Sequence, residues 1–189
     1  VTQGDTNIKC DNLTIMQESS RLIALGKVSA ELIMAQPEEK KPEKQEKPEE
    51  TKKEEEPEEK QDTVNLSGNY LEINKPRQEI FIRTNAKSVF EGMIISGDRI
   101  IYHLAKDDSL LNFEAIKNVR IDIDLKQING DKAEFDVKKK ILTVTGKEVK
   151  YSEEGKLEGS YNKLVYNMNT GTMEFFARDD QLVKTKISN

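Results

Sequence analysis

The chain has 189 residues, of which 30 are Lys or Arg and 35 are Asp or Glu, and its formal net charge is −5. Its single cysteine, Cys10, excludes an intrachain disulfide framework and a zinc site built from several cysteines. The sequence lacks the run of about 18 apolar residues that predicts a transmembrane helix. The part outside one charged segment has no basic excess, so duplex DNA or RNA is not an expected partner.

The first 35 residues favour β-structure. A Gly-Asp phrase, Gly4 to Asp11, opens the chain and predicts a turn followed by a short strand. The apolar spacing of residues 18–34 allows a helix, but Gly26 followed by Lys27 and Val28 favours a strand, a turn and a second strand.

Residues 36–63 contain no apolar side chain, hold four of the five prolines and carry the whole net charge of −5. This composition predicts a disordered Lys/Glu/Pro-rich insert that acts as a solubilising linker or loop. A tail that binds a basic partner is the alternative. Apolar patterns on both sides allow the insert to separate two modules or to interrupt one. The expected division is therefore first β-strands in 1–35, insert in 36–63 and the remaining β-repeats in 64–189.

Beyond the insert the apolar residues recur with a period of two. Phe135 and Val137 alternate with polar residues, and the same alternation occurs in residues 100–104 and 119–123. It predicts strands with one buried face and one wetter face. Turn-forming residues predict turns between strands at 96–98, 129–131, 154–155 and 169–171.

The Gly-Asp phrase repeats along the chain. Its later copies begin at Gly68, Gly97, Gly130 and Gly159, with spacings of 29, 33 and 29 residues. A nearly fixed period predicts stacked units that each bury a face on their neighbours. An elongated antiparallel jellyroll, a β-solenoid and a β-sandwich all satisfy this pattern.

The phrase is clearest in Gly130–Val149 and Gly159–Ala177, and the second copy contains Ser160-Tyr161-Asn162-Lys163-Leu164-Val165-Tyr166-Asn167. With this spacing the sequence resembles the OstA-like family, which includes the lipopolysaccharide-transport proteins LptA and LptC and the amino-terminal domain of LptD. The resemblance implies an all-β fold, an open β-jellyroll of repeated antiparallel strand units. It also implies a periplasmic protein that carries acyl chains inside. The charged insert is foreign to the family pattern, and His103 and Asn167 replace its usual second Asp.

The inward phase of the predicted strands forms one long apolar face. From the residues alone this face is a packed core or a trough for acyl chains, and the resemblance favours the trough. The predicted lipid-binding residues of this apolar groove are Ile8, Cys10, Leu22, Ala24, Ile82, Ile100, Tyr102, Phe113, Val119, Ile121, Phe135, Val137, Leu142, Val144, Leu164, Tyr166, Met173 and Phe175.

The sequence offers little for catalysis, a cofactor or a metal. The single histidine, His103, is expected at the surface, and Asp107-Asp108 is expected to form a turn. Asp122 and Asp124 share a solvent-facing stripe with Arg120. Cys10 is expected to be a buried structural thiol. We therefore expect no enzyme, no cofactor and no metal site.

The leading hypothesis is a non-catalytic protein that binds lipopolysaccharide or a related lipid and bridges the periplasm towards the outer membrane. Other β-jellyroll proteins of the bridge are the expected partners through edge strands, with self-association also possible. The alternative is a structural β-solenoid that polymerises edge to edge without lipid. The chain opens within a repeat at Val1, which suits end-to-end docking or a segment of a longer protein.

Overall fold

The structure, a computed structural model, describes residues 2–3, 6–35, 61–177 and 181–187. These residues form β-strands and one short 3-10 helix, η1 (Lys75–Arg77). The strands are β1 (Thr2–Gln3), β2 (Thr6–Lys9), β3 (Asn12–Met16), β4 (Arg21–Ala35), β5 (Gln61–Asn74), β6 (Glu79–Phe90), β7 (Met93–Leu104), β8 (Leu110–Ile123), β9 (Lys126–Asp136), β10 (Ile141–Glu153), β11 (Lys156–Asn167), β12 (Thr172–Phe176) and β13 (Leu182–Ile187). In the described part of the chain no helix is long and apolar enough to cross a membrane.

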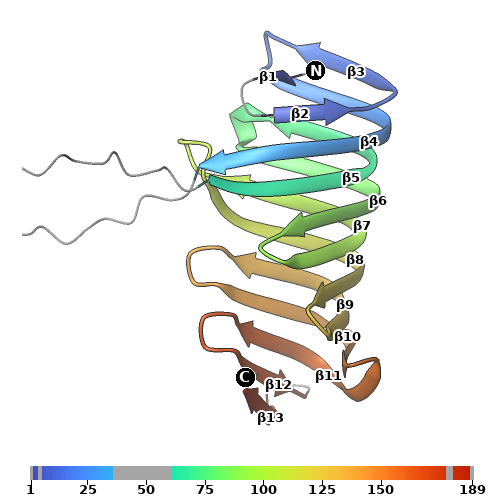
Figure 1. Ribbon diagram of the computed structural model, residues 1–189, viewed down its shortest axis with the longest axis vertical. Coiled ribbons are helices and arrows are strands. Elements are labelled where there is room, and N and C mark those ends of the chain that lie inside the picture. The colour runs from blue at the N-terminus through green and yellow to red at the C-terminus, as the bar shows by residue number, and fades with distance from the viewer. Residues whose placement is uncertain (1, 4–5, 36–60, 178–180, 188–189) are drawn as a thin grey trace, which may run out of the picture.

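All the strands belong to one antiparallel sheet in which nearly every strand pairs with its neighbours in sequence. The order runs β1-β2-β4-β5 and onward to β13, while β3 pairs with β4 beside β2. The strands stack along the long axis of the molecule, with the N and C labels at opposite ends (Figure 1). The two ends of the sheet do not pair with each other, so the sheet is open. This confirms the predicted all-β, open jellyroll.

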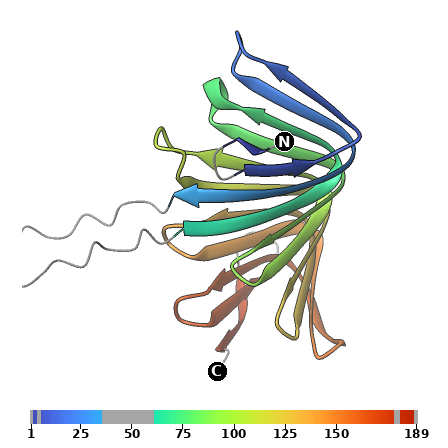
Figure 2. The same ribbon diagram turned by 45° about the horizontal axis from the view of Figure 1, so that its top comes forward.

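A line of bends crosses the middle of the long strands and folds the sheet over (Figure 2). The pairing register shifts there, for example between Leu25 and Val28 in β4 and between Ser96 and Arg99 in β7. Such bulges let a strand bend sharply without leaving its sheet. The predicted turns at 96–98 and 129–131 are therefore wrong, because these residues lie within β7 and β9. The turns predicted at 154–155 and 169–171 are confirmed.

The strand-turn-strand prediction for residues 18–34 also needs correction. β4 is one continuous strand from Arg21 to Ala35, and Gly26 (φ 91°) forms its bulge. Glycine is needed there because a positive φ strains other residues and because a Cβ would lie 2.1 Å from Asp11 Oδ2.

An aspartate that precedes the bulge by 16 residues accepts a hydrogen bond from its backbone. The Lys27 backbone N–H donates to Asp11 Oδ2 at 3.2 Å, and the Lys147 N–H donates to Asp131 Oδ2 at 2.8 Å. In both cases donor and acceptor are 16 residues apart. The bulge frees backbone groups from the ladder, and the carboxylate satisfies one of them. The repeated Gly-Asp phrase thus marks the bends of the sheet.

The charged segment joins two paired strands. β4 and β5 pair along their whole length, from Arg21 with Asn74 to Ala35 with Gln61. The segment therefore interrupts one sheet and does not separate two modules. Residues 36–60 lie outside the described residues, so their predicted disorder stays a prediction. β5 begins at Gln61, inside the predicted insert.

Candidate functional site

The bend divides the sheet into two halves whose inner faces pack together. Half A contains the strand segments around Tyr102 and Phe135, and half B contains those beyond the bend, around Met93. Phe90 pairs with Met93 in half B, yet its ring centroid lies 6.4 Å from that of Phe113 and 6.1 Å from that of Phe135, both in half A. The sheet thus encloses an apolar interior between its halves.

The structure places nearly all the predicted groove residues in this interior. One hydrophobic cluster contains Ile8, Ala24, Ile82, Ile100, Tyr102, Phe113, Val119, Ile121, Phe135, Val137, Leu142, Val144, Leu164, Tyr166, Met173 and Phe175, all buried. The other two predicted residues, Cys10 and Leu22, are half-buried at the amino-terminal end of the cluster. The prediction that Cys10 is a buried thiol is therefore wrong.

Most of the interior that the sequence pattern missed belongs to half B. The missed side chains there include Val28, Ala30, Leu32, Met34, Val64, Leu66, Ala86, Phe90, Met93, Ile95, Ile123, Ile128, Val149 and Tyr151. In β7, β9 and β10 the bend explains the omission, because the bulge changes which alternate residues point inward. In β4, β6 and β8 the buried residues keep the same alternation on both sides of the bend, so the bulge does not explain the residues missed there. In β9 the buried residues are Ile128 before the bend and Ala133 and Phe135 after it. A mid-strand glycine followed by Asp, as at Gly130, is the signal that marks this change.

A pair of hydroxyl groups connects the two halves inside the interior. Ser88 on half B hydrogen-bonds to the Tyr102 hydroxyl on half A, and both residues are fully buried. Burial raises the pKa of the Tyr102 hydroxyl well above its ordinary value. The phenol therefore stays neutral and serves as a hydrogen-bonding group in a mostly apolar interior.

The interior is closed along most of its length. Phe113 and Phe135 at its centre are 0% exposed. Burial decreases towards both ends of the described sheet, where Leu13 near the amino-terminal end and Tyr161 near the carboxyl-terminal end are only partly covered. The described interior is therefore a packed apolar core that is less covered at its two ends.

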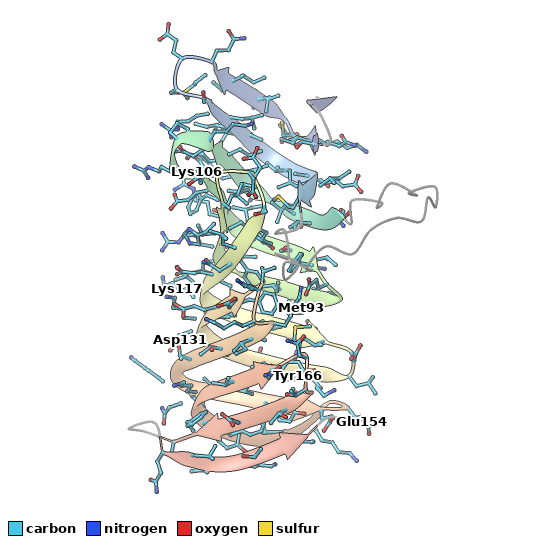
Figure 3. All side chains as sticks on the ribbon, turned by 90° about the vertical axis from the view of Figure 1, so that its left-hand side faces the viewer. Met93, Lys106, Lys117, Asp131, Glu154 and Tyr166 are labelled. Carbon is cyan, nitrogen blue, oxygen red and sulfur yellow. The ribbon has the colours of Figure 1, made fainter. Side chains whose placement is uncertain are left out.

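The hairpin turns of the two halves form two rims. Rim A comprises the turns at 17–20, 75–78, 105–109, 137–140 and 168–171, and rim B comprises those at 91–92, 124–125 and 154–155. Figure 3 shows Lys117 and Asp131 at the bend along one side of the molecule and Glu154 of rim B on the opposite side. We call the line where the rims meet the seam.

Among the residues that the structure describes, two ion pairs cross the seam. Lys140 of rim A contacts Glu91 of rim B, and Lys186 of β13 contacts Glu153 at the end of β10. Lys186 belongs to half A because its Cα partner is Met173, which pairs in turn with Tyr166. The hydrogen bond from Lys186 lowers the pKa of Glu153 below its ordinary value.

Polar side chains on the outer face form ion pairs typical of a solvated sheet. His103 lies 3.8 Å from Glu79 and 3.5 Å from Glu114, and it is partly exposed, as predicted. Arg120 pairs with Asp122 at 3.0 Å, as predicted, but Asp124 lies in the turn after β8 and is not part of the predicted stripe. Among the described residues no group of His, Cys, Asp and Glu is arranged to hold a metal ion.

The last strand presents charge to the interior. Lys184 and Lys186 of β13 face inward, since their Cα partners Phe175 and Met173 are buried. The Lys184 ammonium lies 5.6 Å from the Phe175 ring. Inward-facing lysines at an edge strand discourage uncontrolled pairing with other chains.

One known protein family matches more than half of the chain. The family described as "LptA/(LptD N-terminal domain) LPS transport protein" matches residues 1–108. Among solved structures, LptH from Pseudomonas aeruginosa, described as the LptA homologous periplasmic component of the lipopolysaccharide transport device, is 11% identical with a TM-score of 0.49. That alignment covers 55% of this chain and 75% of LptH. A search of curated proteins gives no match. Since the family match spans more than half of the residues of this chain, the chain belongs to the LptA/LptD amino-terminal-domain family of lipopolysaccharide-transport proteins.

Proposed function

We propose that this protein is a non-catalytic periplasmic carrier that holds the acyl chains of lipopolysaccharide along its apolar interior on their way to the outer membrane. Membership of the transport family supports the general role. The observation that carries the proposal is the apolar inner face, which continues from Ile8 on β2 to Phe175 on β12. The predicted groove residues are assigned as the lipid track on this basis.

The open sheet gives acyl chains a route into the interior. Within the described residues no strand pairing joins rim A to rim B, so side-chain contacts hold the two rims together there. Separating the rims breaks those contacts without breaking a backbone ladder. Acyl chains that replace the packing between the halves gain about 0.8 kcal/mol for each buried CH₂ group. The polar headgroup stays at the seam, where charged side chains and water are available.

Transfer along such a track is passive, and its direction comes from other components of the transport machinery. Edge strands at the two ends offer unpaired backbone groups to further jellyroll proteins. At the carboxyl end, Leu182 and Val183 of β13 are 50% and 52% exposed, which suits a covered edge in an assembly. A bridge of stacked jellyrolls would join the separate interiors into one track.

A second function is favoured by the closed interior. Side chains such as Phe113 and Phe135 are fully buried, as in an ordinary packed core. A scaffold protein that polymerises through its edges and binds no lipid has the same property. The two functions differ in whether lipid reaches the inward side chains.

Photo-crosslinking at adjacent residues on opposite faces distinguishes them. A photoreactive phenylalanine analogue replaces Phe135, which faces inward, or Glu134, which is exposed on the outer face. Each purified variant is irradiated with purified lipopolysaccharide, after a thermal melt shows that it is folded. We expect labelling at Phe135 and little at Glu134. Labelling at neither position, with end-to-end oligomers still forming, would favour the scaffold.

A further inference from the structure

The seam is held at two separate points by ion pairs between residues far apart in sequence. Lys140 and Glu91 are separated by 49 residues, and Lys186 and Glu153 by 33 residues. Their side chains are between 21% and 31% exposed. Each pair lies at the border between solvent and the apolar interior, where Coulomb attraction is stronger than in bulk water.

The residues next to these pairs belong to the interior. Phe90 precedes Glu91 and packs its ring against Phe113 and Phe135 of the opposite half. Tyr151 lies two residues before Glu153, and its ring contacts Phe175 of half A at a centroid distance of 5.3 Å. Breaking either ion pair therefore exposes aromatic side chains of the proposed lipid track.

The rims also carry opposite charges. Each described turn of rim B contains one carboxylate and no base, in Glu91, Asp124 and Glu154. Rim A contains the run Lys138–Lys140. Burial and the charge of Asp124 raise the pKa of Tyr166 on half A, which indicates that this carboxylate also faces the opposite half. The described turns of rim A together carry six bases and three carboxylates, so the net charges of the two rims are opposite and favour contact along the seam.

We propose that the Lys140–Glu91 and Lys186–Glu153 pairs are latches that hold the seam shut over the interior while it contains no lipid and that break when lipid enters. This regulation rests on the proposed function, because it assigns a gate to the same track. Ion pairs of this exposure suit a latch that must open. Each contributes about 1 kcal/mol at most, which corresponds to about a fivefold change in the population of the open state. A backbone ladder across the seam would be far harder to open.

Charge-removing substitutions test the latch through the rate of lipid entry. The variants are Glu91→Gln, Glu153→Gln and the double variant. The control is Glu148→Gln, which breaks the Lys150–Glu148 pair within the outer surface of β10 and leaves the seam intact. Entry of fluorescent lipopolysaccharide is followed by stopped flow. We expect about fivefold faster entry for each single variant, a larger increase for the double variant and no change for the control.

A second measurement needs no lipid. Spin labels at position 125 of rim B and position 139 of rim A report the width of the seam, since Leu125 and Lys139 are both exposed. The native thiol is removed by Cys10→Ser. We expect a larger fraction of long label-to-label distances in the double variant than in the protein with intact ion pairs. Glu148→Gln should leave the distribution unchanged.

The two readouts separate failure of the latch from failure of the proposed function. An unchanged distance distribution in the double variant overturns the latch, whatever the lipid does. Equal entry rates in all variants also overturn it and leave the carrier function standing. If the distances lengthen but lipopolysaccharide enters no variant, the seam opens as proposed and the carrier function fails.

Discussion

At the scale of single residues, the bends depend on small side chains and on the carboxylates that face them. Gly26 lies close to Asp11, and Gly146 lies close to Asp131. A Cβ on Gly146 would lie 2.9 Å from the Asp131 backbone nitrogen. The sequence shows the Gly-Asp repeat clearly. It does not show that the phrase bends a continuous strand, because the same residues also form turns between strands. Only the pairing partners distinguish the two cases.

Substitution of Gly26 by Ala should destabilise the fold more than the same substitution at Gly92. Both glycines have positive φ, 91° and 76°, so both substitutions strain the backbone by about 1 kcal/mol. A Cβ at Gly92 meets nothing within 4 Å, whereas one at Gly26 displaces Asp11 from the Lys27 N–H. We expect Gly26→Ala to cost at least ~1 kcal/mol more in urea unfolding. Equal losses would contradict the bulge-cap role of Asp11.

The buried hydroxyl pair makes a second prediction at this scale. Tyr102→Phe leaves the Ser88 hydroxyl buried without its partner and should cost about 1–3 kcal/mol of unfolding free energy. Ser88→Ala should have a similar cost. The double variant should lose less than the sum of the two, because neither the Ser88 nor the Tyr102 hydroxyl is then left buried without its partner. Strict additivity in a double-mutant cycle would mean that the hydroxyls do not interact.

At the scale of strands, the sequence pattern identified half of the interior and missed most of the other half. The period-2 alternation correctly placed residues such as Phe113 and Phe135 inward. It failed beyond the bends, where Ile128 and Tyr151 are buried in a different phase. The alternation can be extrapolated only along a regular stretch of strand, because a bulge of one extra residue moves the side chains that follow to the other face. The positions of the bulges must therefore be known before the alternation can predict the inward residues of both halves of the sheet.

The hairpin of β4 and β5 predicts the effect of shortening the charged segment. Ala35 and Gln61 are paired, so a four-residue turn in place of residues 36–60 can close the same hairpin. The shorter loop should raise the free energy of unfolding by about 1–2 kcal/mol through a smaller closure entropy. A Gly/Ser segment of the original length is the control and should match the wild type. A loss of stability on shortening would show that the segment contributes contacts to the fold.

At the scale of the whole molecule, the fold class followed from the repeat spacing together with the family resemblance. The position of the apolar face followed from alternation. The repeat spacing and the alternation did not predict the closed seam, because Glu91 and Lys140 become neighbours only when the sheet folds over. Contacts between rims depend on the bend angle and twist of the complete sheet, and these leave no local pattern in the sequence.

The seam should weaken in acid. The hydrogen bond from Lys186 lowers the pKa of Glu153 in the folded protein. The contribution of ionised Glu153 to the stability of the fold is therefore complete above the unfolded-state pKa of about 4.3. It is lost as the pH falls through the lower pKa of the folded protein. We expect the difference in melting temperature between wild type and Glu153→Gln to be present at neutral pH and to vanish in acid. A difference that grows as the pH falls would contradict this assignment.

The central claim is that lipid occupies the whole interior, and a crosslinking scan along its length tests it most directly. A photoreactive residue is placed in turn at Phe113, Phe135 and Tyr166 on the inner face of half A, and at their exposed or half-exposed neighbours in sequence. The account predicts lipopolysaccharide labelling at all three inward positions and little at the neighbours. Labelling confined to the partly covered end near Leu22, with none at Phe113, Phe135 or Tyr166, would contradict a continuous track.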